Sequence, residues 1–464
     1  MQNWMKALTS DLLQFLNESP CNFLAVKNVI TRLERAGFSE ADMAEPWTLA
    51  PGDRRYVVKN SSAIFAFVVG SDTPAAGFHI ISAHSDSPGF RIKPNAEIVG
   101  EGGMVTLNTE VYGGPILYTW FDRPLSIAGR VTVRSSDPLN PDTRMVNFGR
   151  PLLTIPHLAI HFNRAVNEGN PLSRQRDMLP VLGRVEKPEE SKGLLTRMVA
   201  DELGVTPEEI LDFDLTLYDT TPACTFGLND EFISSGRIDD LEMVHAAVTA
   251  LCDAAEKRPM AEATRVVAIF DNEETGSGTK QGAASPILSS IFRRICACRA
   301  AAGADSFSDY SRAVARSFMI SADNGHALHP NYTSKQDPTN HPIQGDGPVV
   351  KINANCKYMT DGRSAGIFRA ICADAGVPCQ SFVNHSDTPG GSTLGNILTS
   401  QIELEGVDMG APQWAMHSVR ETAAVADHLY TVEAFTLSSP SEGAAAPRRP
   451  APRNIGSITR VILG

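Results

Sequence analysis

Three segments of the chain share one design, in which an apolar run typical of a buried β-strand is followed at once by polar residues. The segments are FHIISAHSD at 78–86, RVVAIFDNEE at 265–274 and RSFMISADNGH at 316–326. Two other stretches, at 241–255 and 367–372, carry apolar residues at helical spacing. Strands that alternate with helices predict an α/β fold, whose ligands gather beyond the carboxyl ends of the strands. We therefore expect the three polar clusters to meet at one edge of a sheet.

The middle of the chain has a different pattern. Between about residues 94 and 228, β-rich pieces alternate with glycines, as in GGMVTLNTEVYGG at 102–114 and LSIAGRVTVRS at 125–135. A chain of 464 residues also exceeds one core, at about 150 residues per domain. We interpret the pattern as a β-rich domain inserted into an α/β domain. The expected division is residues 1–93 and 229–437 for the α/β domain, 94–228 for the insertion, and 438–464 for a flexible, proline- and alanine-rich tail.

Composition and charge exclude several classes of partner. The hydrophobic fraction of 42% is that of an ordinary globular protein, and no apolar run approaches the roughly 18 residues that a membrane-spanning helix needs. A net charge of −12 argues against nucleic acid, because phosphate binding requires a basic face. The same charge does not exclude a small acidic substrate, which needs only one or two cations in a pocket.

The beginning of the chain favours a cytoplasmic protein. Trp4, Leu8, Leu12 and Leu16 recur at helical spacing around Asp11, which suits an amphipathic helix better than a signal peptide. Eight cysteines are scattered without a CxxC pair, as in a reduced chain. Without an export signal, the cytoplasm is the expected compartment.

Imidazole and carboxylate side chains recur where the predicted strands end, and again near residue 417. The set comprises His84 with Asp86, the acids around Asp239, Glu273 with Glu274, Asp323 and His417. These are the ligand types of zinc and related divalent cations. A single strand-end Asp more often caps a turn, and a single His more often has a structural role. Two histidines and several acids at equivalent edges of one sheet instead predict a metal site.

The adjacent Glu273 and Glu274 sharpen this prediction. Neighbouring side chains on an extended segment point in opposite directions, so one can bind a metal while the other contacts a water. Without a cation, the two carboxylates would repel each other and raise a pKa. A solvated acidic turn is the alternative, and it would be favoured if the pair stood alone.

Several long motifs make the chain resemble the M18 metallopeptidases, the aspartyl aminopeptidase family. In chain order they are SAHSDSPGFRIKP (82–94), VYGGPILYTWFDRPLSIAGRV (111–131), IPHLAIHFNR (155–164), DNEETGSGTKQGA (271–283), SADNGHALHPNY (321–332), GPVVKINANCKY (347–358) and MHSVRE (416–421). The resemblance spans nearly the whole chain up to about Phe435. It implies a mixed-sheet α/β zinc-exopeptidase catalytic domain, with the inserted β-rich domain serving dimerisation.

The resemblance also implies a site for two metal ions, zinc first, with manganese or cobalt as alternatives. Asp239 would bridge the ions, His84 and Asp323 would complete one site, and Glu274 and His417 would complete the other. The family usually has Asn after the bridging aspartate, whereas this chain has Asp240. The choice of Asp239 over Asp240 therefore rests on alignment.

Two residues would support the chemistry of these ions. Glu273 would be the general base that activates a metal-bridging water. Asp86, two residues after His84, would orient the His84 imidazole. A dimetal site lowers the pKa of such a water, polarises the scissile carbonyl and anchors the free amine of the substrate.

The resemblance further implies residues that contact the substrate. Lys351 would face an acidic side chain, with Arg91 and Lys93 as reserves, and without the resemblance Lys351 would be interpreted as a surface lysine. His329 and Tyr358 are expected beside the substrate, although His329 could equally satisfy loop carbonyls. His161 would reach the active site of a neighbouring subunit.

The favoured function is thus a cytosolic dizinc aminopeptidase that removes N-terminal Asp or Glu from peptides. It would be a homo-oligomer, a dodecamer built from dimers if it follows the family. One alternative is a related dimetal exopeptidase or deacylase with a preference for neutral residues. The other is a metal-binding assembly protein without turnover, against which the intact Glu273 argues, because a scaffold needs ligands but no base.

Overall fold

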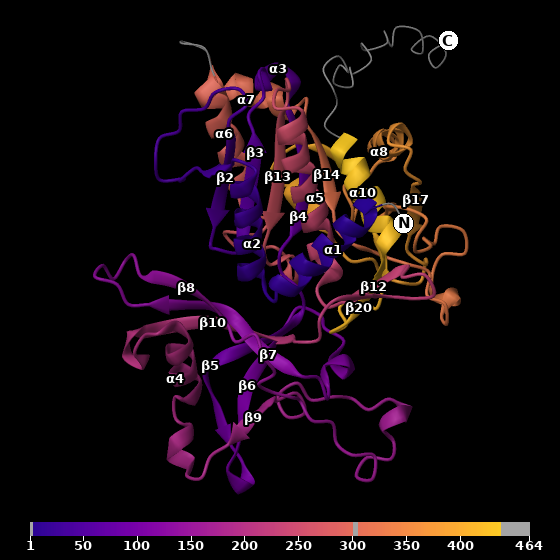
Figure 1. Cartoon of the computed structure of the whole chain (residues 1–464). Coiled ribbons are helices and arrows are strands. Elements are labelled where there is room, and N and C mark those ends of the chain that lie inside the picture. Colours follow the sequence, from indigo (N-terminus) through magenta and orange to yellow (C-terminus); the bar gives the residue numbers. More distant parts are fainter. Residues whose placement is uncertain (1–2, 300–304, 438–464) are drawn as a thin grey trace, which may run out of the picture.

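The central element of the structure is a nine-stranded mixed sheet, in the upper part of Figure 1. The computed structural model describes residues 3–299 and 305–437. In spatial order the strands are β1 (Ser39–Glu40), β2 (Arg54–Lys59), β3 (Ala63–Val68), β13 (Thr264–Phe270), β4 (Phe78–His84), β14 (Phe318–Ala322), β18 (Glu405–Gly410), β16 (Val349–Ile352) and β17 (Gln380–Val383). The neighbours β13, β4, β14 and β18 run parallel, so their carboxyl ends share one edge.

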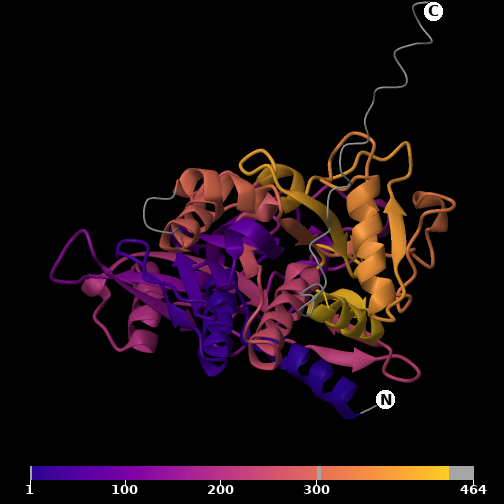
Figure 2. The ribbon, with the colours of Figure 1, turned by 90° about the horizontal axis from the view of Figure 1, so that it is seen from above.

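Helices cover both faces of this sheet, which explains why its strands are apolar on both faces. The helices are α1 (Asn3–Glu18), α2 (Asn22–Arg35), α3 (Thr73–Ala76), α5 (Ile238–Lys257), α6 (Ile287–Arg299), α7 (Ser306–Val314), α8 (Gly362–Asp374), α9 (Leu394–Leu398) and α10 (Val425–Leu437). One core lies under α1, α2, α5, α8 and α10, and the other lies under α6, α7 and α9. Helices α1, α5 and α10 pack together, as Figures 1 and 2 show. In β3, Ile64 and Ala66 enter the first core, whereas Phe65 and Phe67 enter the second.

Residues 89–219 build a separate six-stranded antiparallel sheet, in the lower part of Figure 1. Its order is β8 (Asp142–Asn147), β7 (Leu125–Val133), β10 (Ile210–Asp219), β5 (Gly89–Val99), β6 (Met104–Tyr112) and β9 (Val181–Arg184), and α4 (Leu194–Leu203) packs on it. We call residues 89–219 the inserted unit and propose that it is the core of the inserted domain. The limits expected from the sequence fall within β5, at residue 94, and in the turn that follows β11 (Cys224–Phe226), at residue 228.

A five-stranded sheet brings a late segment of the chain to the start of α5. Its order is β11, β12 (Phe232–Ser235), β20 (Glu421–Ala424), β19 (Pro412–Trp414) and β15 (Gly325–His326). Strand β12 leads directly into α5 and pairs with β20, and residue 417 lies in the loop between β19 and β20. This pairing therefore places the loop beside the first turn of α5.

The structure confirms the secondary structure that the sequence predicted. Strands β4, β13 and β14 are the three strands with polar ends, α5 and α8 cover the two helical patterns, and α1 covers the amphipathic pattern at the start. All eight cysteines are free thiols. The tail expected at 438–464 lies outside the described residues. Within 3–299 and 305–437, no helix combines the length and apolar character that crossing a membrane demands.

Candidate metal centre

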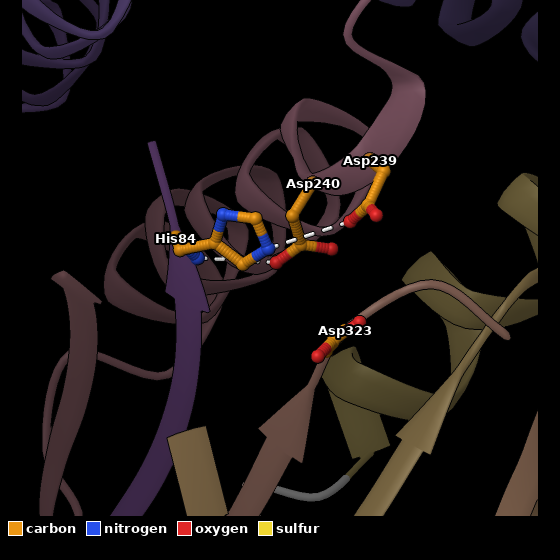
Figure 3. A group of neighbouring side chains, drawn as sticks. All are labelled: His84, Asp239, Asp240 and Asp323. Carbon is orange, nitrogen blue, oxygen red and sulfur yellow. Dashed lines mark hydrogen bonds and ion pairs between the residues drawn. The ribbon is translucent and has the colours of Figure 1, made fainter. Parts of the chain in front are cut away.

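The carboxyl ends of three neighbouring parallel strands carry residues of the predicted site. His84 is the last residue of β4, and Asp323 follows β14. Glu273 and Glu274 begin a 3-10 turn, η6 (Glu273–Thr275), just after β13. Figure 3 shows His84 and Asp323 around one space together with two acids of the first turn of α5. The polar clusters thus meet at one edge of the sheet, as the α/β pattern predicted.

Asp239, at the start of α5, lies between the two histidines. Its Oδ1 is 3.3 Å from Nε2 of His84, and its Oδ2 is 3.5 Å from Nε2 of His417. Oε2 of Glu274 is 3.3 Å from the same nitrogen of His417. Asp239 therefore belongs to two groups of potential ligands, one with His84, Asp240 and Asp323 and one with Glu274 and His417. This geometry supports Asp239 as the carboxylate shared by two cations.

Asp240 has a different set of partners from Asp239. Its Oδ2 accepts the backbone N–H of His84 at 3.1 Å, and its Oδ1 accepts the backbone N–H of Asn324 at 3.3 Å. Burial raises the pKa of Asp240 well above its ordinary value, and the charges of Asp323 and Asp239 add to the effect. Because both oxygens of Asp240 hold the ends of neighbouring strand segments, the geometry favours Asp239 as the bridging ligand.

The residues present fit a pair of divalent cations. Oε1 of Glu274 is a buried oxygen without a hydrogen-bond partner among the described residues, and Oδ1 of Asp239 is a buried oxygen that faces Nε2 of His84. Burial, together with the charges of neighbouring acids, raises the pKa of Glu273 to about 9 and that of Glu274 to about 7. Buried carboxylates so close together are costly unless a cation compensates them. Imidazole nitrogens and carboxylate oxygens are the donor types that zinc accepts.

Both histidines of the cluster are flanked by carboxylates that stabilise an added proton. Burial acts to lower the pKa of His84, but the charge of Asp240 and hydrogen bonds with other acids raise it well above the ordinary value. Burial likewise opposes protonation of His417, and hydrogen bonds to Asp239 and Glu274 outweigh it and raise the pKa of His417 to about 11. A cation and these protons would therefore compete for the same nitrogens.

Asp86 contacts both the His84 ring and the turn that carries the two glutamates. Its Oδ1 lies 3.3 Å from Nδ1 of His84, and its backbone carbonyl lies 3.1 Å from the same nitrogen. The carboxylate also accepts the backbone N–H groups of Glu273 and Glu274, at 3.1 and 3.2 Å. Nδ1 of His84 is thus engaged on the side of Asp86, while Nε2 faces Asp239. These contacts support the orienting role expected for Asp86.

A cavity of about 590 Å³ adjoins the cluster and is lined in part by Lys351, Tyr358 and His329. The side chain of Lys351 is buried, and its Nζ lies 3.0 Å from Oδ1 of Asp323. The interpretation of Lys351 as a surface lysine is therefore wrong, because β16 is an inner strand of the sheet. His329 lines the cavity, and its Nδ1 accepts the backbone N–H of Asn331 at 3.2 Å, so this nitrogen bonds a loop N–H and not the loop carbonyl of the alternative expectation.

The two reserve cations lie elsewhere. Arg91 and Lys93 are on β5 of the inserted unit, where Arg91 pairs with Asp214 and Lys93 donates to Gln175. Neither is among the described residues that line the cavity. Of the three candidate cations, the structure therefore brings only Lys351 to this cavity.

His161 is not brought to the metal cluster of its own chain. It is exposed in the loop 156–165 of the inserted unit and is not among the described residues that line the cavity. The same loop exposes Leu158, Ile160 and Phe162, whose exposed fractions are 56%, 52% and 80%. Neighbouring exposed apolar side chains of this kind mark a contact surface.

Sequence reasoning missed two side chains that hold the site together. The carboxylate of Glu421 accepts the backbone N–H of Asp239 at 3.0 Å and that of His417 at 2.7 Å. The hydroxyl of Tyr112 donates to Asp86 at 2.6 Å. Both residues stand in quoted motifs, VYGG and MHSVRE. A motif does not show which of its members supports which ligand, so membership of a motif was the only signal for Tyr112, and for Glu421 there was also its position near His417.

Comparison with known proteins identifies the family. The family model described as "Aminopeptidase I zinc metalloprotease (M18)" matches residues 15–437. The "Probable M18 family aminopeptidase 2" of Clostridium novyi (strain NT) is 47% identical over 436 residues, which cover 94% of this chain and 99% of that protein. The protein of the same name from Pseudomonas aeruginosa (strain UCBPP-PA14) is 41% identical over 438 residues, or 93% and 98% of the two chains.

Solved structures agree with this assignment. The chain matches the cryo-EM structure of the Ape4 and Nbr1 complex with a TM-score of 0.89 and 35% identity, covering 93% of this chain and 85% of that one. It matches the structure of Chaetomium thermophilum mApe1 with a TM-score of 0.82 and 30% identity, over 94% and 97% of the chains. The structure of the S. cerevesiae mApe1 dodecamer shares the fold, with a TM-score of 0.81 and 23% identity over 94% and 96% of the chains. The chain therefore belongs to the M18 family of zinc metallo-aminopeptidases.

Proposed function

We propose that this aminopeptidase uses two divalent cations, zinc first, to remove N-terminal Asp or Glu from peptides. The observation that carries the acidic preference is the burial of Lys351 between Asp323 and the cavity. Burial would lower the pKa of Lys351, but the charge of Asp323 outweighs it and keeps the pKa raised, so the amine is charged at neutral pH.

Whether Lys351 can bind a substrate carboxylate depends on the charge of its present partner, Asp323. A cation bound by Asp323 would compensate the negative charge of that carboxylate. Lys351 would then present positive charge to the cavity, where a carboxylate of the substrate could replace Asp323 as its partner. An acidic chain with a net charge of −12 needs such a local cation to attract acidic N-terminal residues.

The other residues of the cluster would bind the two cations and transfer the proton of the attacking water. His84 and Asp323 would hold one cation and Glu274 and His417 the other, with Asp239 shared. Bound divalent cations polarise the scissile carbonyl and acidify the attacking water. Burial favours the protonated form of Glu273, whereas nearby cations would favour its carboxylate. In that form Glu273 accepts the proton of the water and can pass it to the leaving amine.

The exposed loop of the inserted unit supports a proposal for the quaternary structure. We propose a homo-oligomer of cytoplasmic chains, in the manner of the mApe1 dodecamer. The exposed apolar residues Leu158, Ile160 and Phe162 would be covered by a second copy. His161, which they flank, would then reach the site of the neighbouring subunit.

The test compares aspartyl, glutamyl, alanyl and leucyl chromogenic substrates with added zinc, manganese or cobalt. Lys351→Ala should lose about 2 to 5 kcal/mol of transition-state binding on acidic substrates, which is roughly 30-fold to several thousand-fold in kcat/KM. Alanyl and leucyl substrates should lose far less, because their side chains never used the charge. Lys335→Ala is the matched control, since Lys335 lines the same cavity but is exposed.

Two outcomes would contradict the proposal. Equal losses of Lys351→Ala on all four substrates would show that Lys351 supports the metal site rather than specificity. A native preference for alanyl or leucyl substrates would favour the neutral exopeptidase. Metal analysis of each variant separates loss of the cations from loss of recognition.

A further inference from the structure

Tyr112 to Gly114, at the end of β6, form a short segment of the inserted unit that lies at the metal centre. We propose that this segment positions both histidine ligands, with Tyr112 acting on His84 through Asp86 and the carbonyl of Gly114 acting directly on His417. The inference rests on the proposed metal site and adds a function to the inserted unit beyond contacts between subunits.

The hydrogen bonds around Tyr112 fix the direction in which its hydroxyl donates. The amide Nδ2 of Asn272 donates to the Tyr112 hydroxyl at 2.9 Å. Oδ1 of Asn272 accepts from Thr279 and Gln281, at 2.9 and 2.8 Å, which sets the orientation of the amide. Since the phenolic oxygen already accepts one bond, its own hydrogen is available for Asp86. Burial and the charge of Asp86 raise the pKa of Tyr112, so the hydroxyl keeps this hydrogen.

Asp86 transmits the contact to the ligands. Its Oδ2 receives the Tyr112 hydroxyl at 2.6 Å and the backbone N–H of Glu274 at 3.2 Å. Its Oδ1 receives the backbone N–H of Glu273 at 3.1 Å and faces Nδ1 of His84 at 3.3 Å. Without the Tyr112 bond, one oxygen of a buried carboxylate loses a partner and the carboxylate can rotate. Rotation would loosen the turn of the two glutamates and would leave Nδ1 of His84 with the backbone carbonyl of Asp86 alone.

The second half of the segment contacts the other histidine. Nδ1 of His417 lies 3.1 Å from the carbonyl oxygen of Gly114, so it donates there and leaves Nε2 for a cation. The backbone N–H of Ile116 in turn donates to the carbonyl of His417 at 2.9 Å. This pair of bonds fastens the His417 loop to the inserted unit.

Gly113 lets the segment come this close. Its φ is +65°, and a Cβ there would lie 3.2 Å from Cβ of Glu274 and 3.3 Å from its carbonyl oxygen. A side chain at this position would therefore be strained and would also push on a metal ligand. Gly149, in the same unit, has a φ of +64° but nothing within 4 Å of a built Cβ. A side chain at Gly149 would therefore have a similar backbone strain but would not contact a metal ligand.

The experiment measures zinc affinity of the full chain by competition with a chromogenic chelator after the metal is stripped. The variants are Tyr112→Phe and Gly113→Ala. Their controls are Tyr218→Phe, which loses a half-buried hydroxyl bond to Asn147 in the same unit, and Gly149→Ala. Both variants should bind zinc about 10-fold or more weakly, as is typical when a partner of a ligand is removed. The controls should stay within about 2-fold of the unaltered chain, since they touch nothing in the metal site.

Unfolding midpoints of the metal-free proteins separate positioning from general stability. Weaker zinc binding by Tyr112→Phe, with a midpoint close to that of Tyr218→Phe, supports the inference. Equal zinc affinity in all four variants, or equal losses in variants and controls, would overturn it. If the unaltered chain bound no zinc, the proposed metal centre would fall and this inference with it.

Discussion

Zinc binding to the metal-free protein should release protons. Burial raises the pKa values of Glu273 and Glu274, and neighbouring carboxylates raise that of His417 against the effect of burial, so these groups carry protons near neutral pH. A cation binds only the deprotonated groups. The number of protons released when zinc is added at pH 7 can therefore be derived from the groups in the cluster.

The count follows from the individual groups. With a pKa of about 9, Glu273 holds nearly one proton at pH 7, and Glu274, at about 7, holds half of one. His417, at about 11, holds one. We expect roughly two to three protons released from these groups per chain when both cations bind. Because protons compete with zinc, zinc affinity should rise as pH increases from 6 to 9.

Calorimetric titration with zinc at pH 7, repeated in buffers of different ionisation enthalpy, measures this number from the slope of the observed enthalpy. Glu273→Gln provides an internal comparison, because glutamine has no proton to release. It should lower the count by about one at pH 7, given the raised pKa of Glu273. A slope of zero, or a zinc affinity independent of pH, would refute the protonated cluster.

Three further predictions concern turnover and stability. Glu273→Gln should lower turnover at least about 100-fold with zinc content unchanged; near-normal turnover would place the base elsewhere. Mixing inactive His161→Ala chains with inactive Glu273→Gln chains should restore activity in hybrid oligomers, and hybrids that stay inactive would contradict action in trans. Burial acts to raise the pKa of Asp11, but hydrogen bonds from His245 and Arg32 outweigh it and lower that pKa. The ionised Asp11 therefore stabilises the folded protein above about pH 4, and this contribution is lost at lower pH. Asp11→Asn should therefore destabilise the protein more at pH 7 than at pH 3 in urea unfolding, and equal effects would exclude the linkage.

Much of the site could be predicted from the sequence because parallel strands impose a simple rule. His84, Asp323 and Glu273 each follow an apolar run, and the carboxyl ends of β4, β14 and β13 meet at one edge. No knowledge of side-chain geometry was needed to bring these residues together. The helical spacing at 241–255 predicted α5 for the same reason, since the apolar pattern alone specifies the buried face.

The position of His417 in the site could not be predicted from the sequence pattern. This residue follows no strand of the nine-stranded sheet, and only the pairing of β12 with β20 brings its loop to α5. Such a pairing joins distant segments and leaves no periodicity in either one. The different roles of Asp239 and Asp240 were equally hidden, because adjacent acids look alike in a sequence. Their partners, His417 on one side and the backbone of Asn324 on the other, are fixed only by the folded backbone.

The place of the insertion in the chain explains why its contacts reach the metals. The chain leaves the nine-stranded sheet at His84 and enters β5 at Gly89, and it returns through β12 to α5, which begins beside Asp239. The two connections of the inserted unit to the α/β domain thus lie next to two of the expected ligands, His84 and Asp239. Because both connections lie at the site, a tilt of the inserted unit against the sheet would move Tyr112 and Gly114 relative to Asp86 and the His417 loop. A contact between subunits made by the inserted unit would therefore act on residues that lie beside the metal ligands.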